Sequence, residues 1–134
     1  MSEFSWKIRV YYEDTDAGGV MYHSQYLNFF ERARTEWLRV RNINQSRLAD
    51  EEGLIFVVRN MEVEFIKPAR LDDELIVSVT LDHMGAASLL LSQTMNRASD
   101  QLLLASANVR AACLSAGEFK PARISKNLRK EILQ

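Results

Sequence analysis

Three acidic residues stand between a strand-like pattern and a long amphipathic helical pattern. They are Glu13, Asp14 and Asp16, and the pair Gly18-Gly19 follows at once. A helix N-terminus carries about half a positive charge and unpaired N–H groups, and glycine lets the backbone turn sharply and approach a ligand. A carboxylate beside such donors is what acyl transfer needs, because one part attacks or activates water while the other holds the oxyanion.

Each of these residues also has a common structural role. An aspartate before a helix is most often an N-cap, and a Gly-Gly pair is most often a turn. His23 opens the helical pattern, where a lone histidine is usually structural. Spacing alone therefore leaves the catalytic and the structural interpretation of Asp16 both open.

Two hydrophobic patterns flank this segment and must position it. Residues 6–12 alternate, with Trp6, Ile8, Val10 and Tyr12 on one face, which predicts a half-buried strand. From residue 22 to residue 40 the apolar side chains recur at spacings of three and four. That period predicts a helix of about five turns with one buried face.

The remainder of the chain is mostly strand-like. A short helix is expected over residues 46–52, ending at Gly53, and strands over 54–66, 74–83, 87–97 and 102–114. The tail, residues 124–133, is expected to be a short basic amphipathic helix or a frayed end. Short connections favour an antiparallel meander.

These elements predict an α+β fold in which a five-stranded antiparallel sheet wraps around a long central helix. Such a sheet leaves edge strands that must be paired or covered. We therefore expect a homo-oligomer, at least a dimer formed by edge pairing.

Composition narrows the function classes. The chain has 134 residues, which suits a single domain over 1–134, and its net charge of −1 gives no basic field for nucleic acid. One cysteine and two histidines make an internal disulfide impossible and a metal site unexpected. No signal peptide and no transmembrane segment is visible, so we expect a cytoplasmic protein.

The segment from Tyr11 to Arg34 resembles the signature of the 4-hydroxybenzoyl-CoA thioesterase-like hotdog family. The matching residues are Tyr12, Asp14-Thr15-Asp16, Gly19, Tyr22, Tyr26 and Glu31-Arg32-Ala33-Arg34. Further along, Phe56 to Arg59, Val63-Glu64 and Pro68 to Asp73 are similar to the Tol-Pal-associated acyl-CoA thioesterase subgroup. The resemblance covers nearly the whole chain.

The resemblance implies a tetrameric acyl-CoA thioesterase of the hotdog fold, with the acyl thioester at a subunit interface and no cofactor besides the CoA thioester substrate. It makes Asp16 the catalytic nucleophile or general base. It gives the backbone N–H of His23 the role of polarising the thioester carbonyl, and it places the side chains of His23 and Tyr12 near the thioester. Asp14 is then a structural acceptor.

The expected substrate-binding residues are Gly19, Val20, Arg59 and Ser88. In relatives the turn before the fourth strand carries basic residues that meet the CoA phosphates, whereas here the turn 84–88 has none. Phosphate contacts would then come from Arg59, Lys67, Arg70 or a neighbouring subunit. The acyl carrier could equally be an acyl carrier protein.

Two rival functions follow from other features. A hotdog dehydratase would need a histidine in a Phe-Pro-Gly type motif, and neither proline lies near His23 or His83. A non-catalytic protein that binds acyl carrier protein, or a scaffold of envelope or phospholipid metabolism, could use basic patches such as Arg39, Arg41 and Arg47. Such a scaffold would not need an intact Asp16.

Overall fold

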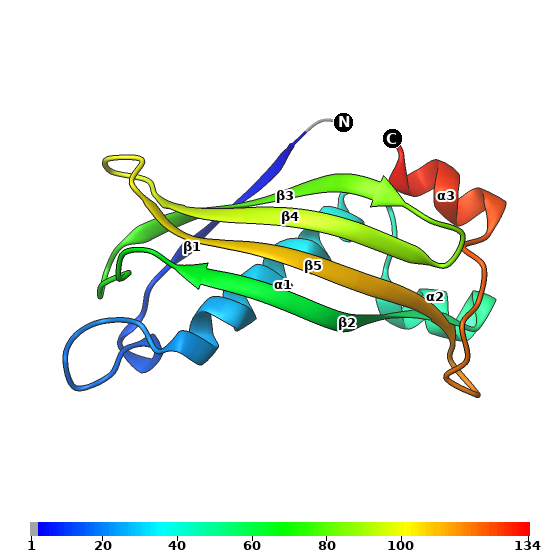
Figure 1. Cartoon of the computed structure of the whole chain (residues 1–134), viewed down its shortest axis with the longest axis horizontal. Helices are drawn as coiled ribbons and strands as arrows, with labels where there is room; N and C mark the ends of the chain where they lie inside the picture. The colour runs from blue at the N-terminus through cyan, green and yellow to red at the C-terminus, as the bar shows by residue number, and fades with distance from the viewer. Residues whose placement is uncertain (1–2) are drawn as a thin grey trace.

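The computed structural model describes residues 3–134, so the first two residues of the expected domain lie outside it. Its five strands form one antiparallel sheet in the order β1-β3-β4-β5-β2 (Figure 1). The strands are β1 (Phe4–Arg9), β2 (Leu54–Phe65), β3 (Glu74–Met84), β4 (Ser88–Arg97) and β5 (Leu103–Ser115). The outermost strands, β1 and β2, each have one free edge.

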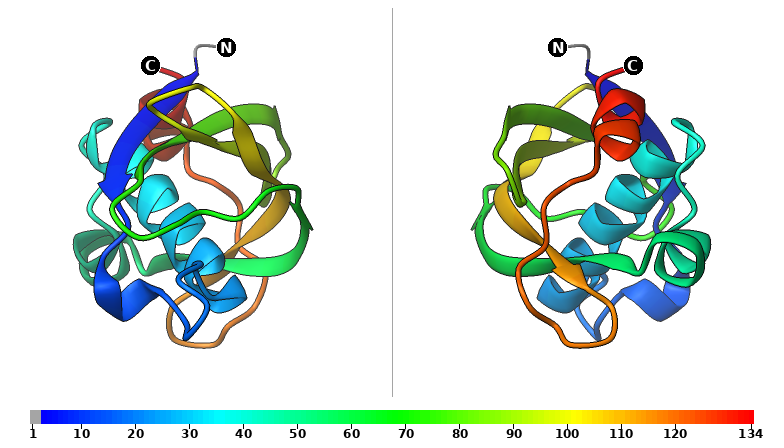
Figure 2. Two further views of the ribbon diagram at one scale, coloured as in Figure 1. Left: turned by 90° about the vertical axis from the view of Figure 1, so that its left-hand side faces the viewer. Right: turned by 90° about the vertical axis from the view of Figure 1, so that its right-hand side faces the viewer.

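Helix α1 (His23–Arg39) lies in the curve of this sheet, as the end-on views of Figure 2 show. Its buried face includes Phe29, Phe30 and Ala33, all fully inaccessible to solvent. Opposite them the sheet contributes side chains such as Val77 and Met95, which are equally inaccessible. The sheet wrapped around a central helix is therefore confirmed as the hotdog arrangement, and the helix begins and ends within one residue of the predicted limits.

Two short helices close the far end of the molecule. Helix α2 (Gln45–Glu52) ends at Gly53 in the left-handed conformation, as expected. Helix α3 (Lys126–Ile132) buries Leu128 and Ile132. The tail is therefore a packed helix rather than a frayed end.

The prediction of one strand over residues 6–12 is wrong in its second half. Strand β1 ends at Arg9, and Tyr12–Asp14 form the 3-10 turn η1. Val10 is fully buried, whereas Tyr12 is 83% exposed, so the two do not share a face. The cause is the Asp14 carboxylate, whose Oδ2 accepts the backbone N–H of Tyr11 at 2.8 Å and folds the chain out of the sheet.

The prediction of a simple meander is also wrong for one strand. Strands β3, β4 and β5 are consecutive neighbours, but β2 pairs with β5 at the opposite edge from β1. The connection 66–73 therefore crosses the end of the sheet from β2 to β3. Three strand spacings amount to about 14 Å, which eight residues span easily and a tight hairpin turn could not.

Candidate active site

The acidic segment forms a short hairpin that leads directly into α1. Thr15 and Met21 are antiparallel bridge partners, and the N–H of Asp16 donates to the carbonyl of Val20 at 2.9 Å. The turn closes with the Gly19 N–H on the Asp16 carbonyl at 3.1 Å, and Gly19 has a φ of +77° that favours glycine. Because residues 15 and 21 lie side by side, Asp16 is held next to the start of α1.

The Asp16 carboxylate is half-buried and only partly used by the fold. Its Oδ1 accepts the N–H of Gly18 at 2.8 Å, which fixes the side-chain rotamer. Within residues 3–134 its Oδ2 accepts no hydrogen bond. A Cβ on Gly18 would stand 3.2 Å from Oδ1, so the absence of a side chain at this position avoids a close contact with the Asp16 carboxylate. Sequence reasoning overlooked this role of Gly18, although an Asp followed two residues later by Gly is a usual Asx-turn pattern.

Asp14, two residues earlier, is instead buried, and the fold uses its whole carboxylate. It is 5% exposed, and both of its carboxylate oxygens are occupied. Oδ2 accepts from the Tyr11 N–H at 2.8 Å, and Oδ1 accepts from Nε2 of Gln25 at 3.1 Å. This is the geometry of a structural acceptor that ties η1 to the first turn of α1.

The N-terminus of α1 has no side-chain cap. Tyr22 occupies the N-cap position with extended backbone, and its side chain accepts no hydrogen bond from the helix. In the part of the chain that the structure describes, the N–H groups of His23 and Ser24 have no acceptor, whereas Gln25 N–H reaches the Tyr22 carbonyl at 3.0 Å. Two backbone donors and the positive end of the helix dipole are thus open beside Asp16.

An aromatic cluster fixes the start of the helix against the end of β2. The His23 ring lies 4.4 Å from the Phe65 ring, and the Tyr26 ring meets Phe65 edge-on at 5.2 Å. Phe65 is 43% exposed, and Tyr22, Leu27 and the neighbouring Ile66 are exposed as well. Large exposed apolar side chains that gather at one place mark a surface that a ligand or partner covers.

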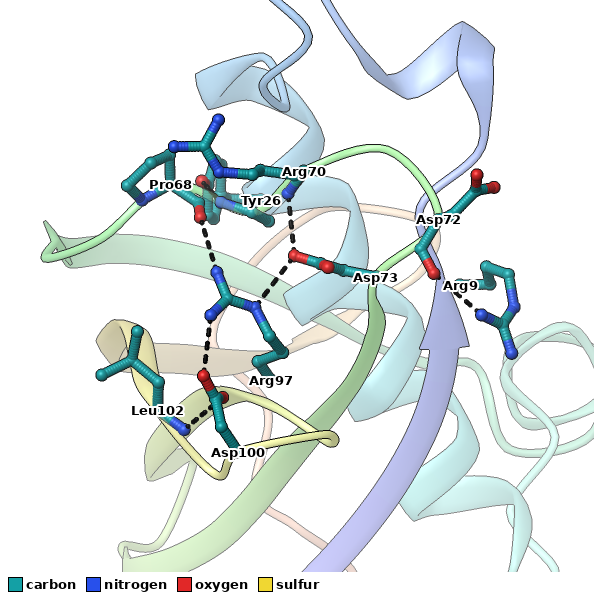
Figure 3. A network of polar contacts seen from close by, with 10 residues as sticks. Arg9, Tyr26, Pro68, Arg70, Asp72, Asp73, Arg97, Asp100 and Leu102 are labelled. Atoms are coloured by element: carbon teal, nitrogen blue, oxygen red, sulfur yellow. Dashed lines mark hydrogen bonds and ion pairs between the residues drawn. The ribbon is translucent and has the colours of Figure 1, made fainter.

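The crossing segment 66–73 carries the hairpin. The carbonyl of Ala69 accepts the N–H of Met21, and the N–H of Ala69 donates to the buried Tyr26 hydroxyl, both at 2.8 Å (Figure 3 labels Tyr26). Val20 and Arg70 are antiparallel bridge partners. Local sequence patterns do not show that Ala69 and Tyr26 hold the Asp16 hairpin, because Ala69 lies about fifty residues beyond Asp16 and Tyr26 lies on α1.

Of the other predicted site residues, Gly19 and Val20 lie beside Asp16, whereas the side chains of Tyr12, Arg59 and Ser88 do not gather there in one chain. The Tyr12 side chain projects into solvent from η1. Arg59 is exposed at the β2 bulge, about 20 Å along the strand from Phe65. Ser88 begins β4, whereas the end of β4 nearest the hairpin is Arg97, about 30 Å away by the same rise. Gly19 and Val20 lie in the hairpin itself.

A cavity lies in the groove between α1 and the edge strand β2. Its volume is about 460 Å³, and its lining is mostly apolar, with Trp37, Phe56 and Val58 among the contributors. Arg34 lines it too and donates from Nη1 to Oε1 of the buried Gln93 at 2.9 Å. Burial lowers the pKa of Arg34, and nearby Glu31 opposes that shift. Sequence reasoning had not assigned this groove.

Within residues 3–134, His, Cys, Asp and Glu form no group of three that could hold a metal ion. None of the helices in that range is long and apolar enough to cross a membrane.

Comparison with known proteins supplies an independent finding. An acyl-CoA thioesterase named YbgC from Haemophilus influenzae is 44% identical over 94% of this chain and 91% of its own. The crystal structure of a probable thioesterase from Bartonella henselae is 37% identical, covers 92% of this chain and all of its own, and has a TM-score of 0.86. The 1,4-dihydroxy-2-naphthoyl-CoA thioesterase Slr0204 from Synechocystis, 24% identical, shares the fold over 99% of this chain and 97% of its own, with a TM-score of 0.91. Because the model of the thioesterase-like superfamily matches residues 10–132, the chain belongs to that superfamily.

Proposed function

We propose that the protein hydrolyses acyl-CoA thioesters and that Asp16 is its catalytic carboxylate. The observation that carries this proposal is the pairing of an open carboxylate oxygen with an uncapped helix N-terminus on one short loop. The name of the Haemophilus relative, similar over nearly the whole chain, supports the same activity. An open carboxylate oxygen and open helix-end N–H groups at one place are the two parts that hydrolysis of a thioester needs.

In the proposed reaction the thioester carbonyl oxygen accepts the N–H of His23. That contact strengthens as the oxygen gains charge in the tetrahedral intermediate. Asp16 then follows one of two routes. Direct attack expels the thiolate and forms a mixed anhydride that water hydrolyses, whereas general-base action removes a proton from water as it adds to the carbonyl. Acid quenching of a single turnover with a labelled acyl group separates the routes, because only the first leaves label on the protein.

The same proposal gives roles to the remaining predicted site residues near Asp16. The side chain of His23, stacked on Phe65, would orient the thioester from the helix side. Gly19 and Val20 would flank the thioester from the hairpin, and Tyr12 would approach it from η1. No cofactor takes part, since a carboxylate, water and backbone donors suffice for both routes.

We further propose that a second copy completes the site. Antiparallel pairing of the free β2 edges about a two-fold axis would set the Phe65 end of one strand beside the Phe56 end of the other. The groove between α1 and β2 in one subunit would then receive the acyl group of a thioester held at Asp16 of its partner. Ser88 and Arg59 would come near the site from the same partner, and two such dimers would make a tetramer.

The substrate carrier is CoA in this proposal, with acyl carrier protein as its competitor. Exposed Arg59, Lys67 and Arg70 are the cations on β2 and the crossing segment that could meet CoA phosphates. The proposed setting, by resemblance to the Tol-Pal-associated subgroup, is the cytoplasm. Fractionation of cells carrying the tagged protein, with Tol-Pal components followed in parallel, tests that assignment.

Release of free thiol from a panel of acyl-CoAs and acyl carrier proteins tests the activity. Wild-type protein should release thiol from at least one acyl-CoA, and the Asp16→Asn protein should not do so at a comparable rate. Thiol release that is equal in the two proteins would place the chemistry elsewhere. Tight binding of acyl carrier protein with no thiol release from any substrate would favour the non-catalytic alternative.

A further inference from the structure

We propose that Arg97 is a positioning residue for Asp16 and that it acts through residues 68–73 of the crossing segment. This inference rests on the proposed function, because it takes Asp16 as the catalytic carboxylate. Arg97 lies at the end of β4 and touches neither Asp16 nor the start of α1 in any hydrogen bond of residues 3–134. Its effect would pass through a continuous series of hydrogen bonds.

Arg97 contacts the crossing segment at two places, Pro68 and Asp73 (Figure 3). Its Nε donates to Oδ2 of Asp73 at 3.1 Å, and its Nη2 reaches the carbonyl of Pro68 at 3.5 Å. On the outer side its Nη1 donates to Oδ2 of Asp100 at 2.9 Å. The side chains of Arg97 and Asp73 are each only 19% exposed, so this ion pair is more sheltered than a typical surface pair.

The segment needs such support because its turn is strained. Asp72 has a φ of +70°, a conformation that costs a non-glycine residue about 1 kcal/mol. The turn is closed by the Asp73 N–H on the Arg70 carbonyl at 3.1 Å and by the Arg70 N–H on Oδ2 of Asp73 at 3.0 Å. The same Asp73 oxygen thus receives Arg97 and the backbone of Arg70.

From this turn the connection to Asp16 is short. Arg70 bridges Val20, and the carbonyl of Val20 accepts the N–H of Asp16 at 2.9 Å. At the other end of the segment, Pro68 precedes Ala69, whose carbonyl accepts the N–H of Met21. A shift of residues 68–73 would therefore move both strands of the hairpin that carries Asp16.

Arginine suits this role because its planar fork reaches several acceptors in a fixed geometry. The backbone of Arg97 is itself anchored to the sheet, with its N–H on the carbonyl of Leu102 at 2.9 Å and the next N–H, of Ala98, on the carbonyl of Glu74 at 2.8 Å. A lysine would supply one point charge and could not keep the contacts to Asp73, Asp100 and Pro68 together. Misplacement of a reacting group by about 1 Å can cost as much as 10²-fold in rate.

The test uses Arg97→Met, Arg97→Lys and a matched control, Arg39→Met. Arg39 also forms a 3.1 Å ion pair, with Glu36, but at the far end of α1. We expect Arg97→Met to lower kcat about tenfold and to change KM less than about twofold, since the acyl groove is intact. Arg97→Lys should recover part of that loss, and Arg39→Met should leave kcat unchanged.

A double-mutant cycle separates positioning from general destabilisation. If Arg97 acts through Asp16, then Arg97→Met should have no further effect on the residual turnover of the Asp16→Asn protein. A second tenfold loss in that background would overturn the inference, and so would unchanged kcat in the Arg97→Met and Arg97→Lys proteins. If the methionine variant does not fold, the lysine variant takes its place in the cycle.

The outcomes also separate this inference from the proposed function. Full activity of the Asp16→Asn protein would refute both. Loss of activity in Asp16→Asn together with full kcat in the Arg97 variants would refute only the positioning role.

Discussion

The two ends of α1 differ in how completely their backbone groups are satisfied. At the N-terminal end Tyr22 provides no cap, and the N–H groups of His23 and Ser24 are open within the described residues. At the C-terminal end the last carbonyls are occupied. Nη1 of Arg41 donates to the Trp37 carbonyl at 2.9 Å, and the Val40 N–H donates to the Glu36 carbonyl at 3.0 Å.

The C-terminal end of α1, where the backbone carbonyls are occupied, is also tightly packed. The Arg41 guanidinium lies 4.9 Å from the centre of the Trp37 ring and donates from Nε to the carbonyl of Ile132 in α3. The neighbouring helices have regular caps, with Asn44 accepting the Arg47 N–H at 3.1 Å and Ser125 accepting the Leu128 N–H at 3.2 Å. Helices α2 and α3 are therefore capped by side chains, whereas the N-terminus of α1 is left open, as the proposed function requires.

Replacement of Asp16 by asparagine, beside the open N-terminal end of α1, should cause the largest loss of turnover. Asparagine keeps the shape and can still accept from Gly18 N–H, but it can neither attack the carbonyl well nor remove a proton from water. We expect thioesterase turnover to fall at least about 10²-fold, which is about 2.7 kcal/mol in barrier. Steady-state thiol release measures kcat, and substrate binding should be largely retained.

The control for that change is Asp14→Asn. Because both Asp14 oxygens accept hydrogen bonds, one of the two asparagine positions becomes a donor facing a donor. Stability should fall, while turnover per folded molecule should change less than in Asp16→Asn. Abolished turnover in Asp14→Asn with near-full turnover in Asp16→Asn would reverse the two assignments.

At the C-terminal end of α1, Arg41→Met should lower stability rather than turnover. The substitution removes two hydrogen bonds to helix carbonyls and a cation–π contact, so we expect the free energy of unfolding to fall by about 2 kcal/mol. Turnover per folded molecule should stay the same. Urea unfolding followed by circular dichroism gives the first quantity, and a marked loss of kcat at full foldedness would contradict the division between the two ends.

A finer test within the hairpin is Gly18→Ala. The new Cβ would meet Oδ1 of Asp16 at 3.2 Å, a tight contact that turns the carboxylate from its place. We expect kcat to fall about tenfold, or about 1.4 kcal/mol in barrier, with little change in melting temperature. Gly117→Ala is the matched control, since a Cβ there meets nothing within 4 Å. Equal kcat in the two variants would show that the carboxylate tolerates the contact.

The smallest expected effect comes from adding a side-chain cap to the N-terminus of α1. Tyr22 has the extended backbone of an N-cap, so Tyr22→Ser should supply the missing cap. Relative to Tyr22→Ala, which also removes the ring, we expect the serine variant to be about 1 kcal/mol more stable. It should also be a few-fold slower, because its hydroxyl would accept the N–H of Ser24 or Gln25 and weaken the positive end of the helix next to the His23 N–H. Thermal unfolding and thiol release on the same pair of variants decide whether stability and turnover move in opposite directions.

Much of the fold could be predicted because the local patterns were strong. The period of α1 and the alternation in β2 to β5 located those elements to within one or two residues. The motif around Asp16 also singled out the residue whose carboxylate oxygen is left open. For the helix and the strands a short stretch of sequence contained the physical cause, whereas Asp16 was singled out by the resemblance to the family.

The rest depended on contacts between distant residues. Nothing local in residues 6–12 shows that the Asp14 carboxylate will pull Tyr11 out of β1. Nothing local in 66–73 shows that this segment crosses the sheet and supports the hairpin. Residues whose importance lies in such contacts, Arg97 and Ala69 among them, look like ordinary strand-end and loop residues in the sequence.

The crossing of segment 66–73 has a consequence for how the protein folds. The hairpin at residues 15–21 makes its supporting contacts with residues about fifty positions later, and β2 pairs with β5 over a similar separation. Contacts between distant residues form slowly, because the chain entropy of closing a large loop is lost before they contribute. During refolding, α1 and the β3-β4-β5 hairpins can therefore form early. The Asp16 hairpin becomes stable only after β2 and the crossing segment are in place. Enzyme activity should be among the last native properties to return.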